Sequence, residues 1–450
     1  MISSDPAFVV VDNTKSELDA LASAMNSLRL PVYSILYGSS PDAIDDHEFR
    51  GVRYLFFDLN LTDGTGVGSG DFNTIQSLLE RGIDIQSGPY VLILWTKYPN
   101  QAQELSRHLV ERIDRAEKLP LQVLALDKSD VLTAPERLKE KLEAAIAAND
   151  VITALFDWES AVKEGAGSAL GDINRLIEPA ENDYPQRAKA WKERVSLMSA
   201  SSIGAANLNG REREAFNAAV IPLVADRVEC RKMTSAQKAS WKKMVTKSKA
   251  KNGQRSIQGD SAGAYHSFIH LHHSNDGIPP FVWGAITELP GKKSWKLLKG
   301  RLGGAKADIL KSFGISKKDA GSVKPFVVRI GAGCDAAQDR REPKQFCLLL
   351  RLPIPLHTEE QDGSVIAHDI TRAKLSPRWE KPGTWISPVF QRLDVDSKPY
   401  VFMAHGLYHF SLVEEQLAGL EANIRLRENL LGDLVSHIGR FQSRTGQILL

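Results

Sequence analysis

The sequence predicts an N-terminal α/β domain with a five-stranded parallel sheet, followed by a helical region and a mostly β domain with a C-terminal helix. Three observations support this. Over the first 132 residues, short apolar runs alternate with amphipathic segments. From residue 133 the apolar residues keep helical spacing, and after residue 260 strand-like runs are separated by Gly, Pro and Asp. The expected regions are 1–132, 133–259, 260–411 and 412–450.

Five strands are expected in the first region. Each is an almost continuous apolar run, which is typical of parallel strands covered on both faces, and amphipathic helical segments lie between them. The strand candidates are FVVVD (8–12), VYSILYG (32–38), VRYLFFDL (52–59), YVLILWT (90–96) and LQVLALD (121–127). This alternation predicts the flavodoxin-like doubly wound fold.

The later regions are expected to be helical and then β. Residues 133–178 and 209–228 have helical periodicity, and AYHSFIHLHH (264–273) is interpreted as the first of several strands. In the closing segment, apolar residues recur at alternating three- and four-residue steps with one charged interruption: Leu417, Leu420, Ile424, Arg427, Leu431, Leu434, Ile438 and Phe441. This spacing predicts a helix docked on its own domain, with a dimerising helix as the alternative.

The overall charge of +2 conceals an asymmetry. Residues 1–132 carry a net −8 and the remainder a net +10, with the basic excess concentrated in 227–255 and 291–318. This indicates an acidic module joined to a basic one.

The longest apolar runs are too short to span a bilayer, the N-terminus lacks the basic residues of a secretory signal, and three cysteines suit a reducing compartment. A cytoplasmic protein without a membrane partner is expected.

Polar side chains stand where the predicted parallel strands end. The first strand ends in Asp12 and Asn13, the third in Asp58 and the fourth in Thr96, and Lys128 follows the fifth. Because the carboxyl ends of parallel strands share one edge of the sheet, we expect these side chains to converge on one crevice.

Together these groups can accept a phosphoryl group. A carboxylate nucleophile forms an acyl phosphate, and Mg²⁺, which prefers oxygen ligands, offsets the repulsion between carboxylate and phosphoryl group. Asp58 is the predicted phosphoacceptor, and Thr96 and Lys128 are expected to receive the phosphoryl oxygens. The predicted metal ligands are Asp12, Asn13, Asp58 and Asn60, with a backbone carbonyl as the ligand expected near Asn60.

FDLNLTDGTG (57–66) resembles the phosphoacceptor strand and loop of the receiver domains of two-component response regulators. The resemblance implies that a histidine kinase phosphorylates Asp58. The chain departs from the family pattern with Asn13 in place of a second acid, Ser129 in place of Pro and Ala125 in place of an aromatic switch residue. These departures leave open a degenerate receiver that binds without switching, and an unrelated α/β domain with polar strand ends.

Two other parts of the chain resemble the receiver proteins of bacterial anti-phage defence two-component systems (Detocs-like). The first is FDWESAVKEGAGSALGDINRLI (156–177); the second comprises CDAAQ (334–338) and RLRENLLGDLVSHIGRF (425–441). The resemblance implies a non-enzymatic phosphoacceptor that acts as signal output or phosphate sink, with a histidine kinase and another receiver-bearing effector as partners; the heptad spacing of the closing segment leaves a second copy of the chain as a further partner. The alternative is a nucleic-acid-binding or effector protein whose degenerate receiver is only an interaction module. The basic stretch 227–255 could bind nucleic acid, although a solvated helix or a surface for the acidic receiver-like domain itself is favoured there. A third hypothesis, an unrecognised hydrolase in the β region, is supported by no group of candidate catalytic residues.

Histidines and cysteines of the β region supply two weaker candidate sites. The first is a zinc site in HSFIHLHH (His266, His270, His272 and His273), where a half-solvated strand is the favoured interpretation. The second combines Cys334 and Cys347 with His405 and His409, and the spacing of these cysteines matches no common zinc module. A buried, inert thiol is favoured for Cys334.

Overall fold

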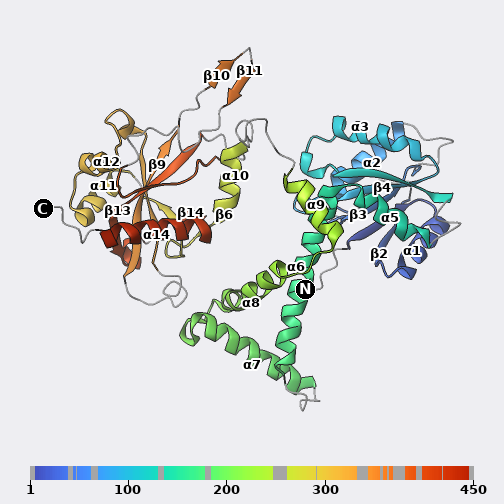
Figure 1. Cartoon of the computed structure of the whole chain (residues 1–450), viewed down its shortest axis with the longest axis horizontal. Helices are drawn as coiled ribbons and strands as arrows, with labels where there is room; N and C mark the ends of the chain where they lie inside the picture. Colours follow the sequence, from blue (N-terminus) through green and yellow to red (C-terminus); the bar gives the residue numbers. More distant parts are fainter. Residues whose placement is uncertain are drawn as a thin grey trace. The chain divides into compact units, whose positions relative to one another are not determined.

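The structure, a computed structural model of the chain, forms two compact units (Figure 1). The first joins Met1–Ala161 to Arg231–Lys247, and the second joins Val162–Cys230 to Ser248–Leu450. None of the helices in the described part of the chain has both the length and the apolar composition needed to cross a bilayer. The residues described are 6–38, 44–46, 48–61, 69–129, 136–177, 184–246, 261–289, 291–331, 343–354, 358–361, 364–367, 381–391, 398–417 and 419–444.

The first unit contains the predicted five-stranded parallel sheet. Its strands are β1 (Phe8–Asp12), β2 (Val32–Leu36), β3 (Tyr54–Asp58), β4 (Val91–Thr96) and β5 (Gln122–Asp127). They lie in the order β2-β1-β3-β4-β5, and every neighbouring pair is parallel. The order reverses between β1 and β3, which is where doubly wound sheets open a crevice at their carboxyl ends. The flavodoxin-like arrangement is therefore confirmed.

Helices cover both faces of this sheet (Figure 1). They are α1 (Lys15–Ser27) and α5 (Arg137–Ala147) on one face, and α2 (Ser69–Gly82) and α3 (Ala102–Arg112) on the other. Successive strand residues point to opposite faces, so the central strands β1, β3 and β4 are apolar along almost their whole length. On β3, Phe56 packs with α1 and α5, whereas Leu55 and Phe57 pack with α2 and α3.

Four further helices follow: α6 (Asp150–Arg175), α7 (Tyr184–Ile203), α8 (Glu212–Glu229) and α9 (Ser235–Thr246). The buried Asp157 carboxylate of α6 accepts hydrogen bonds from Arg231 (2.8 Å), Gln237 (2.6 Å) and Trp241 (3.1 Å). These contacts hold α9 against α6. The helix that was predicted to be solvated in the 227–255 stretch is therefore held against α6 at several positions along its length. Residues 247–260 lie outside the described residues.

The second unit contains a seven-stranded sheet in which every pair of neighbours is antiparallel. Its order is β12-β13-β9-β8-β7-β14-β6. The strands are β6 (Leu271–Ile278), β7 (Ala285–Glu288), β8 (Lys324–Arg329), β9 (Lys344–Pro353), β12 (Thr384–Ile386), β13 (Tyr400–Leu412) and β14 (Ala422–Leu426). A separate two-stranded hairpin joins β10 (Thr358–Gln361) to β11 (Ser364–Ala367).

Helices pack on both faces of this antiparallel sheet as well. Helices α11 (Gly291–Leu302) and α12 (Lys306–Ser312) share a core with one face, and α14 (Glu428–Arg444) shares a core with the other. On β9, Leu348 and Leu350 face α11 and α12, whereas Cys347 and Leu349 face α14. Because helices pack on both faces of the sheet, β9 is apolar on both of its sides.

Two of the expectations for this unit were wrong in part. The closing helix begins only at Glu428, because residues 422–426 form β14, whose backbone pairs with β6 and β7 on its two sides. The AYHSFIHLHH segment begins as helix α10 (Ser261–His270) and becomes a strand only at Leu271. The small residues Gly263 and Ser267, one helical turn apart, allow α10 to pack closely on the backbone of Gln391.

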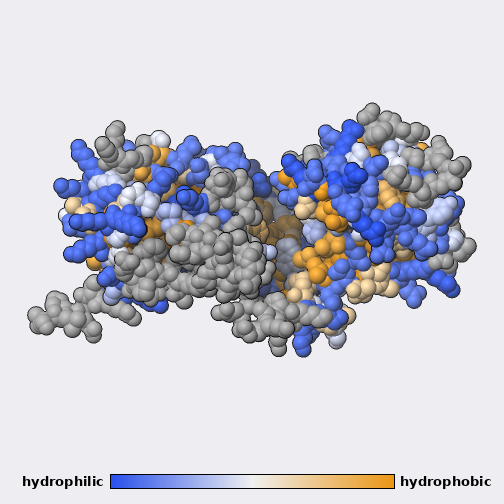
Figure 2. Space-filling model, turned by 90° about the horizontal axis from the view of Figure 1, so that it is seen from above, coloured by the Kyte–Doolittle hydropathy of each residue, from blue (hydrophilic) through white to orange (hydrophobic). Residues whose placement is uncertain are grey.

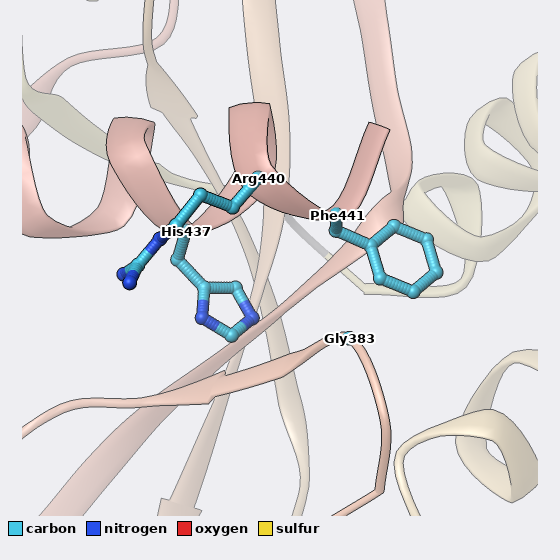
Figure 3. Close-up of a pocket in the computed structure, with 4 residues that line it drawn as sticks. All are labelled: Gly383, His437, Arg440 and Phe441. Atoms are coloured by element: carbon cyan, nitrogen blue, oxygen red, sulfur yellow. The ribbon is translucent and has the colours of Figure 1, made fainter. Parts of the chain in front are cut away.

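The aromatic ring of Phe441 on α14 lies where two glycines leave room for it (Figure 3). A Cβ atom added to Gly383 or Gly406 would lie 2.4 Å from a ring carbon of Phe441. Beside this contact is a cavity of about 240 Å³ lined by Gly383, His437, Arg440 and Phe441. The ring fixes the end of α14 against the sheet.

Replacing Gly406 by Ala should therefore destabilise the second unit by about 1 to 3 kcal/mol, because the added methyl group overpacks the Phe441 ring. Chemical denaturation measures the change. Gly439→Ala on α14 is the matched control, since nothing lies within 4 Å of that position. There the same substitution should stabilise the helix by about 0.5 to 1 kcal/mol. Equal effects at the two positions would contradict the packing argument.

Candidate functional site at the edge of the parallel sheet

Four of the predicted side chains lie at the carboxyl edge of the parallel sheet. Asp12, Asp58 and Thr96 are the last residues of β1, β3 and β4, and Lys128 directly follows β5. All four residues are buried, with exposed fractions of 0%, 6%, 1% and 2%. Buried charged residues require partners, so their contacts decide what the site can do.

Lys128 forms ion pairs with three carboxylates of the site. Its Nζ atom lies 3.0 Å from Asp12 Oδ2 and 3.0 Å from Asp58 Oδ2, and it also contacts Glu17. Asp12 Oδ1 accepts a 2.7 Å hydrogen bond from the backbone N–H of Thr14, which opens α1. Asp12 and Asp58, which are far from Lys128 in the sequence, thus both contact its ammonium group directly.

Thr96 stands on the neighbouring strand. Its Oγ1 accepts a 3.0 Å hydrogen bond from the backbone N–H of Tyr98, which leaves the hydroxyl proton for another acceptor. The register pairs Asp58 with Trp95, so Thr96 lies one residue beyond Asp58 along the sheet edge. This position suits a hydroxyl donor to a group attached to Asp58.

Glu17 belongs to the site although the sequence analysis did not name it. The carboxylate oxygens of Asp12, Glu17 and Asp58 lie within 4.8 Å of one another, and no other comparable group of three His, Cys, Asp or Glu residues occurs in the described part of the chain. Only two residues separate β1 from α1, so the first turn of α1 stands over the sheet edge. That short connection was the available signal, but helical periodicity alone does not distinguish Glu17 from a solvated residue.

The two predicted asparagine ligands have different surroundings. Asn13 Nδ2 donates to the backbone carbonyl of Leu61 (3.4 Å), which ties the loop after β1 to the loop after β3. The backbone N–H of Asn60 donates to Asp58 Oδ1 (3.3 Å). The side-chain oxygen of Asn60 is buried and accepts no hydrogen bond within the described structure. An amide oxygen without a hydrogen bond is the kind of ligand that a hard cation takes.

Burial and ion pairing compete in setting the pKa values of the site. Burial raises the pKa of Asp12 more than the Lys128 charge lowers it. Burial also acts to raise the pKa of Glu17, but its hydrogen bond and charge interaction with Lys128 bring that pKa below its usual value. Burial acts to lower the pKa of Lys128, and the surrounding carboxylates together raise it. When all are ionised, the three carboxylates and Lys128 together carry a net charge of −2, and Glu17 also pairs with the mostly exposed Lys97 at 3.4 Å.

This donor set can hold a metal ion. The carboxylates of Asp12, Glu17 and Asp58 converge within 4.8 Å, and all the ligand atoms are oxygens. Oxygen-only sets suit hard divalent cations, and a charge of +2 would balance the excess negative charge.

Comparison with known proteins finds no matching family model, no matching curated protein and no matching solved structure. The functional inference therefore rests on the fold and on the geometry of the sheet edge.

The other predicted sites do not come together within the described residues. His266 and His270 lie on α10 with ring centroids 6.1 Å apart, whereas His272 and His273 lie on β6, and no three-ligand group forms there. Cys347 is fully buried, and burial raises its pKa to about 12, so its thiol is inert at neutral pH. Cys334 lies outside the described residues.

Replacing Glu17 by Gln should raise the dissociation constant for Mg²⁺ about tenfold, because the variant keeps the shape of the side chain but removes one of three negative charges. Isothermal titration calorimetry with Mg²⁺ measures this directly. Asp19→Asn is the matched control, since Asp19 lies on the same helix and pairs with Lys15 at the surface. An unchanged dissociation constant in the Glu17 variant would exclude Glu17 as a ligand.

Proposed function

We propose that this chain is a response-regulator-like phosphoacceptor protein that receives a phosphoryl group on Asp58 from the phosphohistidine of a histidine kinase. The observation that carries the proposal is the contact of the buried Asp58 and Asp12 carboxylates with Lys128 at the carboxyl edge of a doubly wound sheet. We place it in a defence-type two-component system, as output protein or phosphate sink, on the sequence resemblance alone.

The proposed reaction is a single in-line transfer. A carboxylate oxygen of Asp58 attacks phosphorus, the P–N bond to the kinase imidazole breaks, and an acyl phosphate forms on Asp58. Asp12, Glu17 and Asp58 would hold Mg²⁺, which neutralises charge between carboxylate and phosphoryl oxygens. Lys128 and the free hydroxyl proton of Thr96 then stabilise the transferred oxygens by charge and hydrogen bond.

Phosphorylation would change the partners of Lys128. The phosphoryl group adds about −1.5 to −2 of charge to an edge that is already negative. Lys128 now serves Asp12, Glu17 and Asp58 at once, and a phosphoryl oxygen would compete for the same ammonium. Glu17 is the most exposed of its partners and lies on α1, so a shift of α1 is the expected local response.

The direct test is uptake of a labelled phosphoryl group from a small-molecule phosphodonor. We expect up to one label per chain, strict dependence on Mg²⁺ and loss of the label in base or hydroxylamine, as for an acyl phosphate. A protein that binds Mg²⁺ but takes up no label from the phosphodonor or from a kinase would instead be a degenerate receiver, and the phosphoacceptor proposal would fail.

A further inference from the structure

Helices α11 and α12, together with the residues that follow α12, present a strongly basic surface. We define the basic face as the exposed cations Lys296, Lys299, Arg301, Lys306, Lys311, Lys317 and Lys318. Between residues 295 and 318 the only acidic residue is Asp308. The left end of Figure 2, where α11 and α12 lie in Figure 1, is accordingly rich in hydrophilic side chains.

The fold fixes this surface through the opposite side of the same helices. Leu298, Ile309 and Leu310 are buried in the core beneath the antiparallel sheet, so the cations between them must point outward. The ammonium of Lys306 lies 5.0 Å from the ring centroid of the half-buried Trp295, which positions this cation between the two helices.

Within the described part of the chain, the cations of the basic face are not neutralised by neighbouring acids. Several cations on other helices do pair with acids one turn away, as in Lys139–Glu143, Lys189–Glu193 and Arg211–Glu214. None of the seven cations of the basic face forms an ion pair with any residue of the described part of the chain. A helix that is merely solvated has no need to exclude acids in this way, whereas a surface for a polyanion does.

We propose that the basic face binds nucleic acid through the phosphate backbone, with a preference for duplex and without base specificity. Among the side chains that the structure describes between residues 295 and 318, no large apolar one is exposed, and protein–protein interfaces are depleted of Lys and enriched in aromatic residues. A phosphodiester backbone therefore fits this surface better than an acidic protein does. Trp295 lies beneath Lys306, so the basic face offers no stacking platform for unpaired bases.

The experiment is fluorescence anisotropy of a labelled duplex with the full-length protein over a salt series. About four phosphate contacts would lower the affinity about 100-fold between about 50 mM and about 200 mM salt. The variant K296Q/K299Q/R301Q should bind more weakly and reduce the magnitude of the salt slope by about 2 to 3. Its thermal midpoint should stay near that of the wild type, because the three side chains are exposed.

The matched control K139Q/K189Q/R211Q removes the same three charges from cations that already have acidic partners, and it should bind within about twofold of the wild type. Equal losses in the two variants would assign binding to net charge and overturn the proposal. It would also fail if no salt-sensitive binding were found at low salt, if polyglutamate competed as well as duplex, or if a single strand bound more tightly. None of these outcomes depends on phosphorylation of Asp58.

Discussion

Replacing Asp58 by Asn is expected to abolish phosphoryl uptake while leaving the fold intact. The amide has nearly the same shape as the carboxylate but is not a nucleophile toward phosphorus, so no acyl phosphate can form at this position. The substitution also removes one negative charge from a site with excess negative charge, so the free energy of unfolding should not fall. Label incorporation from a small-molecule phosphodonor measures the first effect, and chemical denaturation measures the second.

Two further variants distinguish the loss of the nucleophile from the loss of a proposed metal ligand. Asp12→Asn keeps the acceptor but removes a buried carboxylate of the proposed metal site, so uptake should slow and need more Mg²⁺. Asp19→Asn, on the surface of α1, should change neither. Full labelling of the Asp58 variant would place the acceptor elsewhere, and equal losses in the Asp12 and Asp58 variants would reduce the role of Asp58 to metal binding.

The parallel sheet was predictable because its strands are buried on both faces. Phe56 packs on one face of β3 and Leu55 and Phe57 on the other, which makes the strand a continuous apolar run. Once the strands were recognised, the convergence of Asp12 and Asp58 followed from the geometry of parallel sheets.

The errors share a physical cause, since local pattern does not determine long-range pairing. Residues 417–441 have heptad spacing, yet Ala422–Leu426 form a strand because β6 and β7 pair with both of its edges. Glu17 was missed for a related reason. Its position in the first turn of α1 is local, but its proximity to Lys128 depends on a contact across 111 residues.

Replacing Lys128 by Met should destabilise the first unit by about 3 to 5 kcal/mol at neutral pH, because Asp12 and Asp58 remain buried without their counter-charge. Chemical denaturation at several pH values measures the effect. Lys97→Met is the matched control: Lys97 also pairs with Glu17, at 3.4 Å, but its side chain is 64% exposed. Its loss should cost less than about 1 kcal/mol.

The pH dependence of the free energy of unfolding identifies why the Lys128→Met variant is less stable than the wild type. Burial already raises the pKa of Asp12, and removing Lys128 removes its main opposing influence, so this pKa should rise further. An acid whose folded pKa lies above its unfolded value destabilises the fold at neutral pH, and the penalty disappears as the pH falls through the folded pKa. The deficit of the Lys128 variant relative to the wild type should therefore shrink on acidification.

Mg²⁺ should reduce the same deficit at neutral pH, because the ion supplies the positive charge that Lys128 provided. The Lys128 variant should also bind Mg²⁺ more tightly than the wild type, since the buried ammonium that competes for all three carboxylates is gone. A deficit that neither acid nor Mg²⁺ reduces would show that Lys128 acts through packing rather than charge. The metal and the lysine would then not share one set of carboxylates, and the proposed exchange of partners on phosphorylation would lose its basis.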